Sequence, residues 1–73
     1  MRNINTLVAV AEKNGFEFYG SFNEDGLQHD ILTCLKGKFN GEVIDLYYNY
    51  RTGEVSQIAH STQFNGQQAI FSF

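Results

Sequence analysis

Apolar and polar residues alternate along most of the chain after Gly15, and turn-forming residues interrupt the alternation at intervals. The alternating runs, rich in aromatic and β-branched residues, predict strands over about 16–22, 27–39, 42–50, 54–64 and 67–73. The turn signals between these runs are Asn23-Glu24-Asp25-Gly26, Asn40-Gly41, Arg51-Thr52-Gly53 and Asn65-Gly66. Asn-Gly is a strong hairpin signal because both residues tolerate the positive φ of a tight turn. The pattern therefore predicts an antiparallel meander.

Residues 3–14 have helical periodicity instead, since their apolar positions fall at i, i+3, i+4 and i+7. These positions are Ile4, Leu7, Val8 and Ala11. Asn3 or Asn5 can cap the start of this helix, and Gly15 stands where a left-handed residue ends one. So short a helix is marginal alone in water, so its apolar side must pack on the sheet. The fold expected is α+β, one domain over 1–73, with an N-terminal helix packed on one face of an antiparallel β-meander of four to five strands.

A two-residue turn at Asn40-Gly41 would set the register of the central hairpin. It pairs Leu35 with Leu46 and places Lys36 directly across from Asp45, a favourable cross-strand pair. Carried through the other turns, this register assigns every strand residue to one of two faces. The face expected beneath the helix carries Phe16, Phe18, Phe22, Leu27, Ile31, Leu35, Phe39, Ile44, Leu46, Tyr48, Tyr50, Ile58, Phe64, Phe71 and Phe73. The outer face carries Tyr19, Leu32, Cys34, Val43, Tyr47, Val55, Ala59 and Ile70, mixed with Glu17, Asp30, Lys36, Asp45, Asn49 and Gln57.

The segment 27–36 also admits a helix, which leaves a second fold open. Leu27, Ile31, Leu32 and Leu35 have helical spacing. Asp25 is a candidate N-cap for this helix, and Gly37 is a candidate stop. The element order would then be α-β-α-β-β-β, in place of a five-strand meander.

Composition narrows the classes of function. The net charge is −3, and the five basic residues are dispersed, so the chain lacks the basic patch that nucleic-acid binding requires. The single cysteine excludes an internal disulfide and fits a reducing compartment. No run approaches the ~20 apolar residues of a membrane span, and polar residues interrupt the N-terminus where a signal peptide would be apolar. We expect a soluble, cytoplasmic protein without a membrane partner.

Residues that could carry chemistry are few and do not converge. Cys34 has His29 and His60 as candidate bases, but the predicted register puts Cys34 and His60 on opposite faces. A metal site needs three or four convergent ligands, and adjacent strand residues such as His29-Asp30 face opposite ways. The sequence contains no phosphate-binding glycine loop, nucleophile elbow or zinc spacing. We therefore expect no catalytic residues, no metal and no cofactor, and the chain is not predicted to be an enzyme.

The outer face is the candidate contact surface, because it is part apolar and contains tyrosine, as the centres of interfaces do. The expected partner-binding residues are Tyr19, Leu32, Val43, Asp45, Tyr47 and Asn49. Strands also favour valine, isoleucine and tyrosine for structural reasons alone. That second explanation of the same residues stays open.

In size, mild acidity, aromatic-rich strands and lack of a site, the chain resembles the small accessory proteins of bacteriophages and mobile elements, anti-CRISPR proteins among them. The resemblance covers general character over the whole chain and involves no particular motif. It implies a non-enzymatic inhibitor that occludes a surface of a larger host protein or complex. The alternative is a structural protein that forms homodimers through a sheet edge, at 16–22 or at 67–73, the latter without any charged residue.

Overall fold

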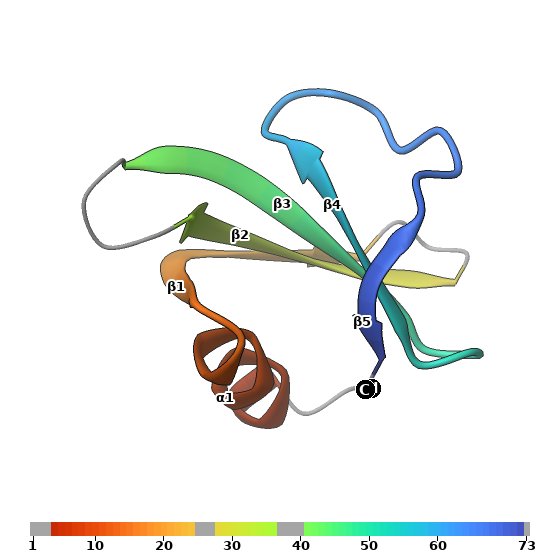
Figure 1. Cartoon of the computed structure of the whole chain (residues 1–73), viewed down its shortest axis with the longest axis horizontal. Coiled ribbons are helices and arrows are strands. Elements are labelled where there is room, and N and C mark those ends of the chain that lie inside the picture. The colour runs from red at the N-terminus through yellow and green to blue at the C-terminus, as the bar shows by residue number, and fades with distance from the viewer. Residues whose placement is uncertain (1–3, 25–27, 37–40, 73) are drawn as a thin grey trace.

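A computed structural model describes residues 4–24, 28–36 and 41–72. Helix α1 (Ile4–Lys13) precedes five strands, which are β1 (Phe16–Glu24), β2 (His29–Lys36), β3 (Glu42–Asn49), β4 (Glu54–Ala59) and β5 (Ala69–Ser72). The strands form one sheet in chain order, and every neighbouring pair is antiparallel (Figure 1). The predicted α+β fold, a helix on an antiparallel meander, is confirmed. The alternative helix over 27–36 is wrong, because His29–Lys36 is a strand.

Helix α1 ends as its sequence predicts. The backbone N–H of Asn14 donates to the carbonyls of Val10 and Ala11, and Gly15 follows with φ +92°. Only glycine adopts this left-handed conformation without strain, so the chain can turn directly from α1 into β1. Leu7 and Ala11 are buried, which places the predicted apolar stripe against the sheet.

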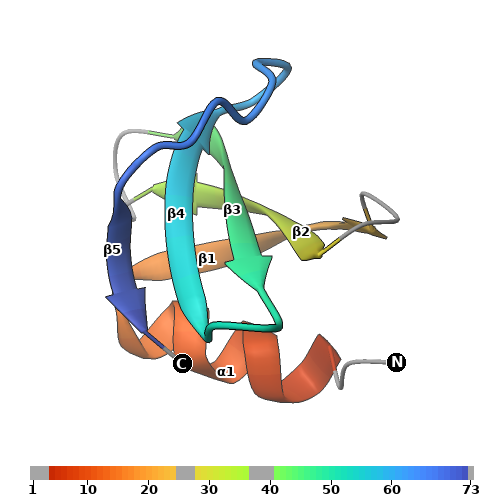
Figure 2. The same ribbon diagram turned by 90° about the vertical axis from the view of Figure 1, so that its right-hand side faces the viewer.

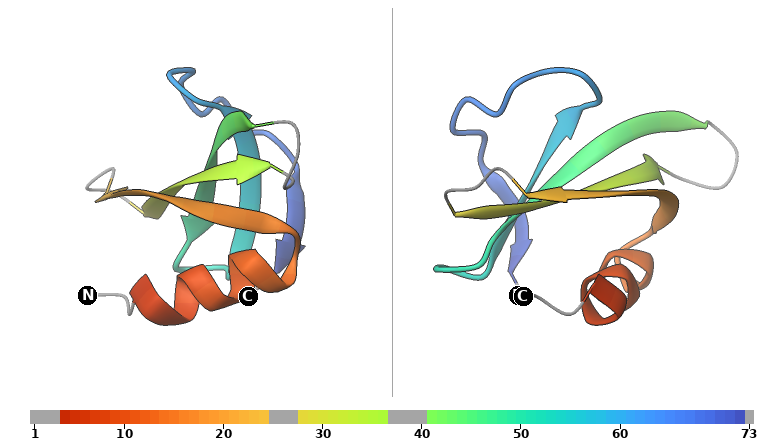
Figure 3. Two further views of the ribbon diagram at one scale, coloured as in Figure 1. Left: turned by 90° about the vertical axis from the view of Figure 1, so that its left-hand side faces the viewer. Right: turned by 180° about the vertical axis from the view of Figure 1, so that it is seen from behind.

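The sheet is strongly curled, and the helix lies along one end of it beneath β1 (Figures 2 and 3). The rings of Phe16 and Phe71 lie 6.2 Å apart between centroids, so the two edge strands β1 and β5 approach each other. We call the sheet face that packs against α1 the helix face. The buried core on this side consists of Leu7, Ala11, Phe16, Leu32, Cys34, Ile44, Leu46 and Val55.

A bulge in β1 lets the edge strand follow this curvature. Phe18 pairs with Cys34, and the next pair is Ser21 with Thr33, so Tyr19 and Gly20 are two extra residues. Gly20 has φ +101°, a conformation that a side chain would strain. Because two residues are inserted, the alternation is preserved, and Phe18 and Phe22 both pack against the core on the helix face.

The register between β2 and β3 differs from the predicted one by three residues. Thr33 pairs with Asp45, and Lys36 pairs with Glu42, so the predicted pairing of Lys36 with Asp45 is wrong. An odd shift exchanges the faces of a strand. Leu32 and Cys34 therefore lie on the helix face, both 0% exposed. Ile31 and Leu35, expected in the core, lie on the opposite face and are half-buried.

Two features explain why this register prevails over the predicted one. Strand β2 has apolar residues at both parities, so alternation alone does not select its buried face. Five residues, not two, connect Lys36 to Glu42, so the connection is too long to impose the register of a tight turn. The Asn40-Gly41 turn itself lies mostly outside the described residues, as do the predicted core residues Leu27, Phe39 and Phe73.

The turn between β3 and β4 forms where it was predicted, with Gly53 left-handed at φ +79°. Its loop is one residue longer than expected, because the Asn49 side-chain Oδ1 accepts the backbone N–H groups of Arg51 and Thr52. Tyr48 consequently pairs with Val55. This shift corrects four predicted positions, since Val55, Gln57 and Ala59 lie on the helix face and Ile58 on the opposite face.

The hairpin predicted at Asn65-Gly66 is wrong. Strand β4 ends at Ala59, an irregular segment follows, and β5 pairs with the start of β4, with Phe71 opposite Val55. This arrangement lets Phe71 reach the core beside Phe16, which the tight hairpin would prevent. Among the described residues, no helix is long and apolar enough to cross a membrane.

Candidate binding surface

We call the face of the sheet that is turned away from α1 the second face. The sequence predicts that this face is open, but in the structure it is partly covered. Its members, assigned from the strand registers, are His29, Ile31, Thr33, Leu35, Val43, Asp45, Tyr47, Asn49, Ser56 and Ile58. Ile58 is 2% exposed and Asp45 is 7% exposed. Residues 60–68, which we call the strap, form part of this cover. Phe64 and Gln67 of the strap contact second-face residues.

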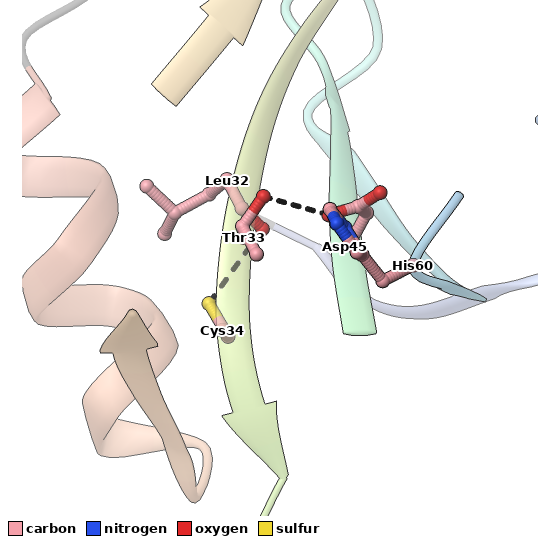
Figure 4. A network of polar contacts seen from close by, with 5 residues as sticks. All are labelled: Leu32, Thr33, Cys34, Asp45 and His60. Atoms are coloured by element: carbon pink, nitrogen blue, oxygen red, sulfur yellow. Dashed lines mark hydrogen bonds and ion pairs between the residues drawn. The ribbon is translucent and has the colours of Figure 1, made fainter. Parts of the chain in front are cut away.

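A polar network lies at one end of the second face (Figure 4). The hydroxyl of Thr33 donates a hydrogen bond of 2.8 Å to Oδ1 of Asp45, its direct cross-strand partner. Nδ1 of His60 lies 3.2 Å from the same oxygen. The His60 side chain is 52% exposed whereas that of Asp45 is 10% exposed, so a buried carboxylate orients a surface imidazole.

Three aromatic rings gather beside this network. The ring of Phe64 stacks on Tyr47 at 5.2 Å between centroids and meets His29 edge-on at 4.8 Å. The rings of His29 and Tyr47 are themselves 5.7 Å apart in an edge arrangement. These separations are those at which aromatic pairs attract one another beyond simple burial.

The strap makes few other contacts with the sheet. The buried hydroxyl of Ser56 donates to the carbonyl of Gln67 at 3.1 Å. Of the nine strap residues, eight are exposed and only Phe64 is half-buried. Ser61 has φ +71°, a left-handed conformation that costs an L-residue roughly 1–2 kcal/mol. The strap is also attached at its start, where His60 contacts Asp45 and its backbone N–H donates to the Val43 carbonyl at 3.4 Å, so Phe64 is the one half-buried side chain among otherwise polar attachments.

The six predicted contact residues divide among three locations. Val43, Asp45, Tyr47 and Asn49 lie on the second face, and all four belong to β3, beside their partners on β2. The prediction that Leu32 belongs to the exposed surface is wrong, because it is fully buried under α1. Tyr19 is 58% exposed, but it lies in the β1 bulge at the sheet edge.

Within this group, Asp45 and Asn49 have structural partners. Asp45 accepts from Thr33, and Asn49 holds the β3–β4 turn through its side-chain oxygen. Val43 and Tyr47 are half-buried. Tyr47 is the aromatic residue among these four, and its ring stacks against Phe64.

His29 and Phe64 belong to the ring cluster on the second face, although the sequence did not predict them there. The predicted Asn65-Gly66 hairpin puts Phe64 on the helix face instead. A usable signal existed, since Phe64 is the single large apolar residue in the polar run from His60 to Gln68. An isolated ring in such a run needs a place to be buried.

The position of the Cys34 thiol does not support a role as a catalytic nucleophile. Cys34 lies in the core, where its Sγ donates weakly to the Leu32 carbonyl at 3.6 Å. Burial, together with the negative charges of Asp45 and Glu12, raises the pKa of the Cys34 thiol to about 12. Thr33 and Cys34 are adjacent strand residues, so the thiol points away from the Asp45–His60 pair (Figure 4).

The described residues also contain no group of three or more His, Cys, Asp or Glu side chains that could hold a metal ion. Comparison of the chain with protein-family models, with curated proteins and with solved structures finds no match.

Proposed function

We propose that the protein is a non-enzymatic protein-binding module whose contact surface is the second face around Tyr47. The observation that carries this proposal is the ring cluster of His29, Tyr47 and Phe64, in which His29 is buried and Tyr47 and Phe64 are half-buried, together with the exposed imidazole of His60 on the neighbouring Asp45. Following the resemblance in general character, the partner is a larger host protein, and binding occludes one of its surfaces.

Tyrosine suits this role for physical reasons. It offers a large contact area at a small cost in ordering, because it has few rotatable bonds, and it is enriched among residues that dominate binding energy. The rings of Tyr47 and Phe64 are nearly parallel, with 19° between their planes, which holds the Tyr47 side chain in place before a partner arrives. A preordered side chain loses less entropy on binding.

The test is affinity capture from host lysate with Tyr47→Ala, matched by Tyr19→Ala, which makes the same chemical change at the β1 edge. Tyr47→Ala should weaken capture by on the order of 2 kcal/mol, the threshold for a hot spot, while Tyr19→Ala leaves it unchanged. Circular dichroism of both variants checks that they are folded. Loss of capture with Tyr19→Ala alone would move the contact surface to the edge of the sheet.

A second candidate is self-association through the sheet edges, and a specific observation favours it. Among the described residues, the exposed large hydrophobic side chains are Tyr19 and Ile70, and they lie on the two edge strands β1 and β5. Exposed edges with little charge invite pairing with another chain. Light scattering of wild type and Ile70→Lys distinguishes the candidates. Edge pairing requires a dimer mass for wild type and a monomer mass for the variant.

A further inference from the structure

We propose that His29 and Tyr47 form a recognition site for one aromatic side chain, and that Phe64 is its resident occupant. A partner peptide supplies a phenylalanine, tyrosine or tryptophan that takes the place of Phe64 when the strap moves aside. This inference rests on the proposed role of the second face as a protein-binding surface. It assigns the strap an autoinhibitory role and gives the partner a defined chemistry.

The site has two walls that do not depend on the strap. His29 is on β2, and Tyr47 is on β3, two neighbouring strands whose pairing fixes the positions of both residues. Phe64 supplies the third ring from outside the sheet, stacked on Tyr47 and edge-on to His29. Removing the Phe64 ring therefore leaves a stacking surface and an edge contact ready for another ring of the same kind.

The strap has the features of a segment that opens locally. It has no regular secondary structure, and eight of its nine residues are exposed. Segments with few buried apolar contacts open at a small fraction of the global free energy of unfolding. Left-handed residues stand on both sides of Phe64, at Ser61 and Gly66, and the strain at Ser61 is relieved when the strap leaves the sheet.

The resident ring also indicates the kind of partner. The site accepts an aromatic side chain within an extended, polar, uncharged stretch, since the strap sequence is His-Ser-Thr-Gln-Phe-Asn-Gly-Gln-Gln. The sheet also supplies polar anchors near the ring site, namely the hydroxyl of Ser56, the cross-strand partner of Tyr47, and the carboxyl of Asp45, which contact Gln67 and His60 of the strap. A protein segment with this pattern fits better than a nucleic acid, which the net charge of −3 would repel.

The experiment uses full-length Phe64→Ala and a nine-residue peptide with the sequence of residues 60–68. In NMR titrations, this peptide should shift the signals of His29 and Tyr47. A control peptide with alanine in place of its phenylalanine should not shift them. Wild type and the matched variant Gln63→Ala should bind the peptide roughly tenfold or more weakly, because their tethered Phe64 competes at an effective concentration on the order of millimolar.

Absence of these shifts in a folded Phe64→Ala protein would overturn the inference. If the variant does not fold, amide hydrogen exchange of wild type decides. Strap amides that exchange well before those of β3 support a displaceable strap, and equal protection contradicts it. A doubled molar mass would indicate a dimer with exchanged straps. The aromatic ring would then come from a second copy of this chain, and the proposal would also be overturned. If Tyr47→Ala no longer captures the partner and Phe64→Ala does not bind the peptide, the proposed function stands and this inference fails.

Discussion

Leu32 and Leu35 are the same residue type on the same strand, yet their surroundings differ. Leu32 is 0% exposed and belongs to the core under α1, whereas Leu35 lies on the second face and is half-buried. Cys34 shares the environment of Leu32, and Thr33 between them points to the polar network. At this scale the face that a residue occupies, more than its hydrophobicity, sets its contribution to stability.

Leu32→Ala should therefore lower the free energy of unfolding by about 2–5 kcal/mol, since it removes a packed side chain and leaves a cavity. Leu35→Ala, the matched control, should cost clearly less because its side chain is already partly in water. Urea denaturation of the two variants measures the difference. The reverse order of the two effects would favour the register that pairs Lys36 with Asp45.

The Cys34 thiol should make the free energy of unfolding depend on pH under alkaline conditions. Its pKa is about 12 in the folded protein against an ordinary value of 9.0, so the native thiol keeps its proton where the unfolded chain releases it. The stabilisation is complete below pH 9 and is lost as the pH rises from about 9 to about 12. Unfolding titrations should show a steeper alkaline loss in wild type than in Cys34→Ala. Equal slopes would mean that the thiol is accessible to water.

At the scale of elements, the connections depart from expectation more than the strands do. Strands β1 to β5 each overlap the segment predicted for them, but the loops after β2 and β4 are long, and β1 contains a bulge. The bulge and the strap both serve packing on a curved sheet. The bulge bends β1, and the strap allows β5 to pair with the first half of β4 while Phe64 covers the second face.

The bulge gives a prediction for Gly20. A Cβ atom there would meet no heavy atom within 4 Å, so the only penalty of Gly20→Ala is the strain of φ +101°. We expect a loss of about 1–2 kcal/mol in the free energy of unfolding. Glu17→Ala, an exposed change on the same strand, should stay within about 0.5 kcal/mol. Chemical denaturation compares the two, and an unchanged Gly20→Ala protein would argue against the bulge.

At the scale of the whole molecule, curling brings the two sheet edges together and closes the core. Phe16 follows α1 directly and Phe71 lies near the C-terminus, so their contact joins opposite ends of the chain. A chain of this size buries only about 60% of its unfolded surface, so a single long-range contact of this kind matters for stability. The same curvature separates the helix side, which is the core, from the second face with its strap.

A double-mutant cycle tests this closure. Phe16→Ala and Phe71→Ala should show a coupling free energy of about 0.5–1.5 kcal/mol, as expected for an aromatic pair in contact. The cycle of Phe16→Ala with Phe64→Ala should be additive, because these rings lie on opposite faces of the sheet. Thermal and urea unfolding supply the four free energies of each cycle. Additivity of the first pair would mean that β1 and β5 do not approach each other in solution.

Local chemistry in the sequence was sufficient for the helix, its stop at Gly15, the order and antiparallel sense of the strands, and the left-handed Gly53. These features depend on periodicity and on backbone φ preferences, which act within a few residues. Four of the six predicted contact residues also lie together on one face, because alternation within β3 is a local property.

Registers and faces were decided by the tertiary structure. Strand β2 has apolar residues on both sides, and only the packing of α1 on the curled sheet selects Leu32 and Cys34 for the core. The position of Phe64 likewise depends on β5 reaching back to Val55, a pairing between segments well separated in the chain. No local signal records such contacts, because the free energy that selects them comes from burial between elements distant in sequence.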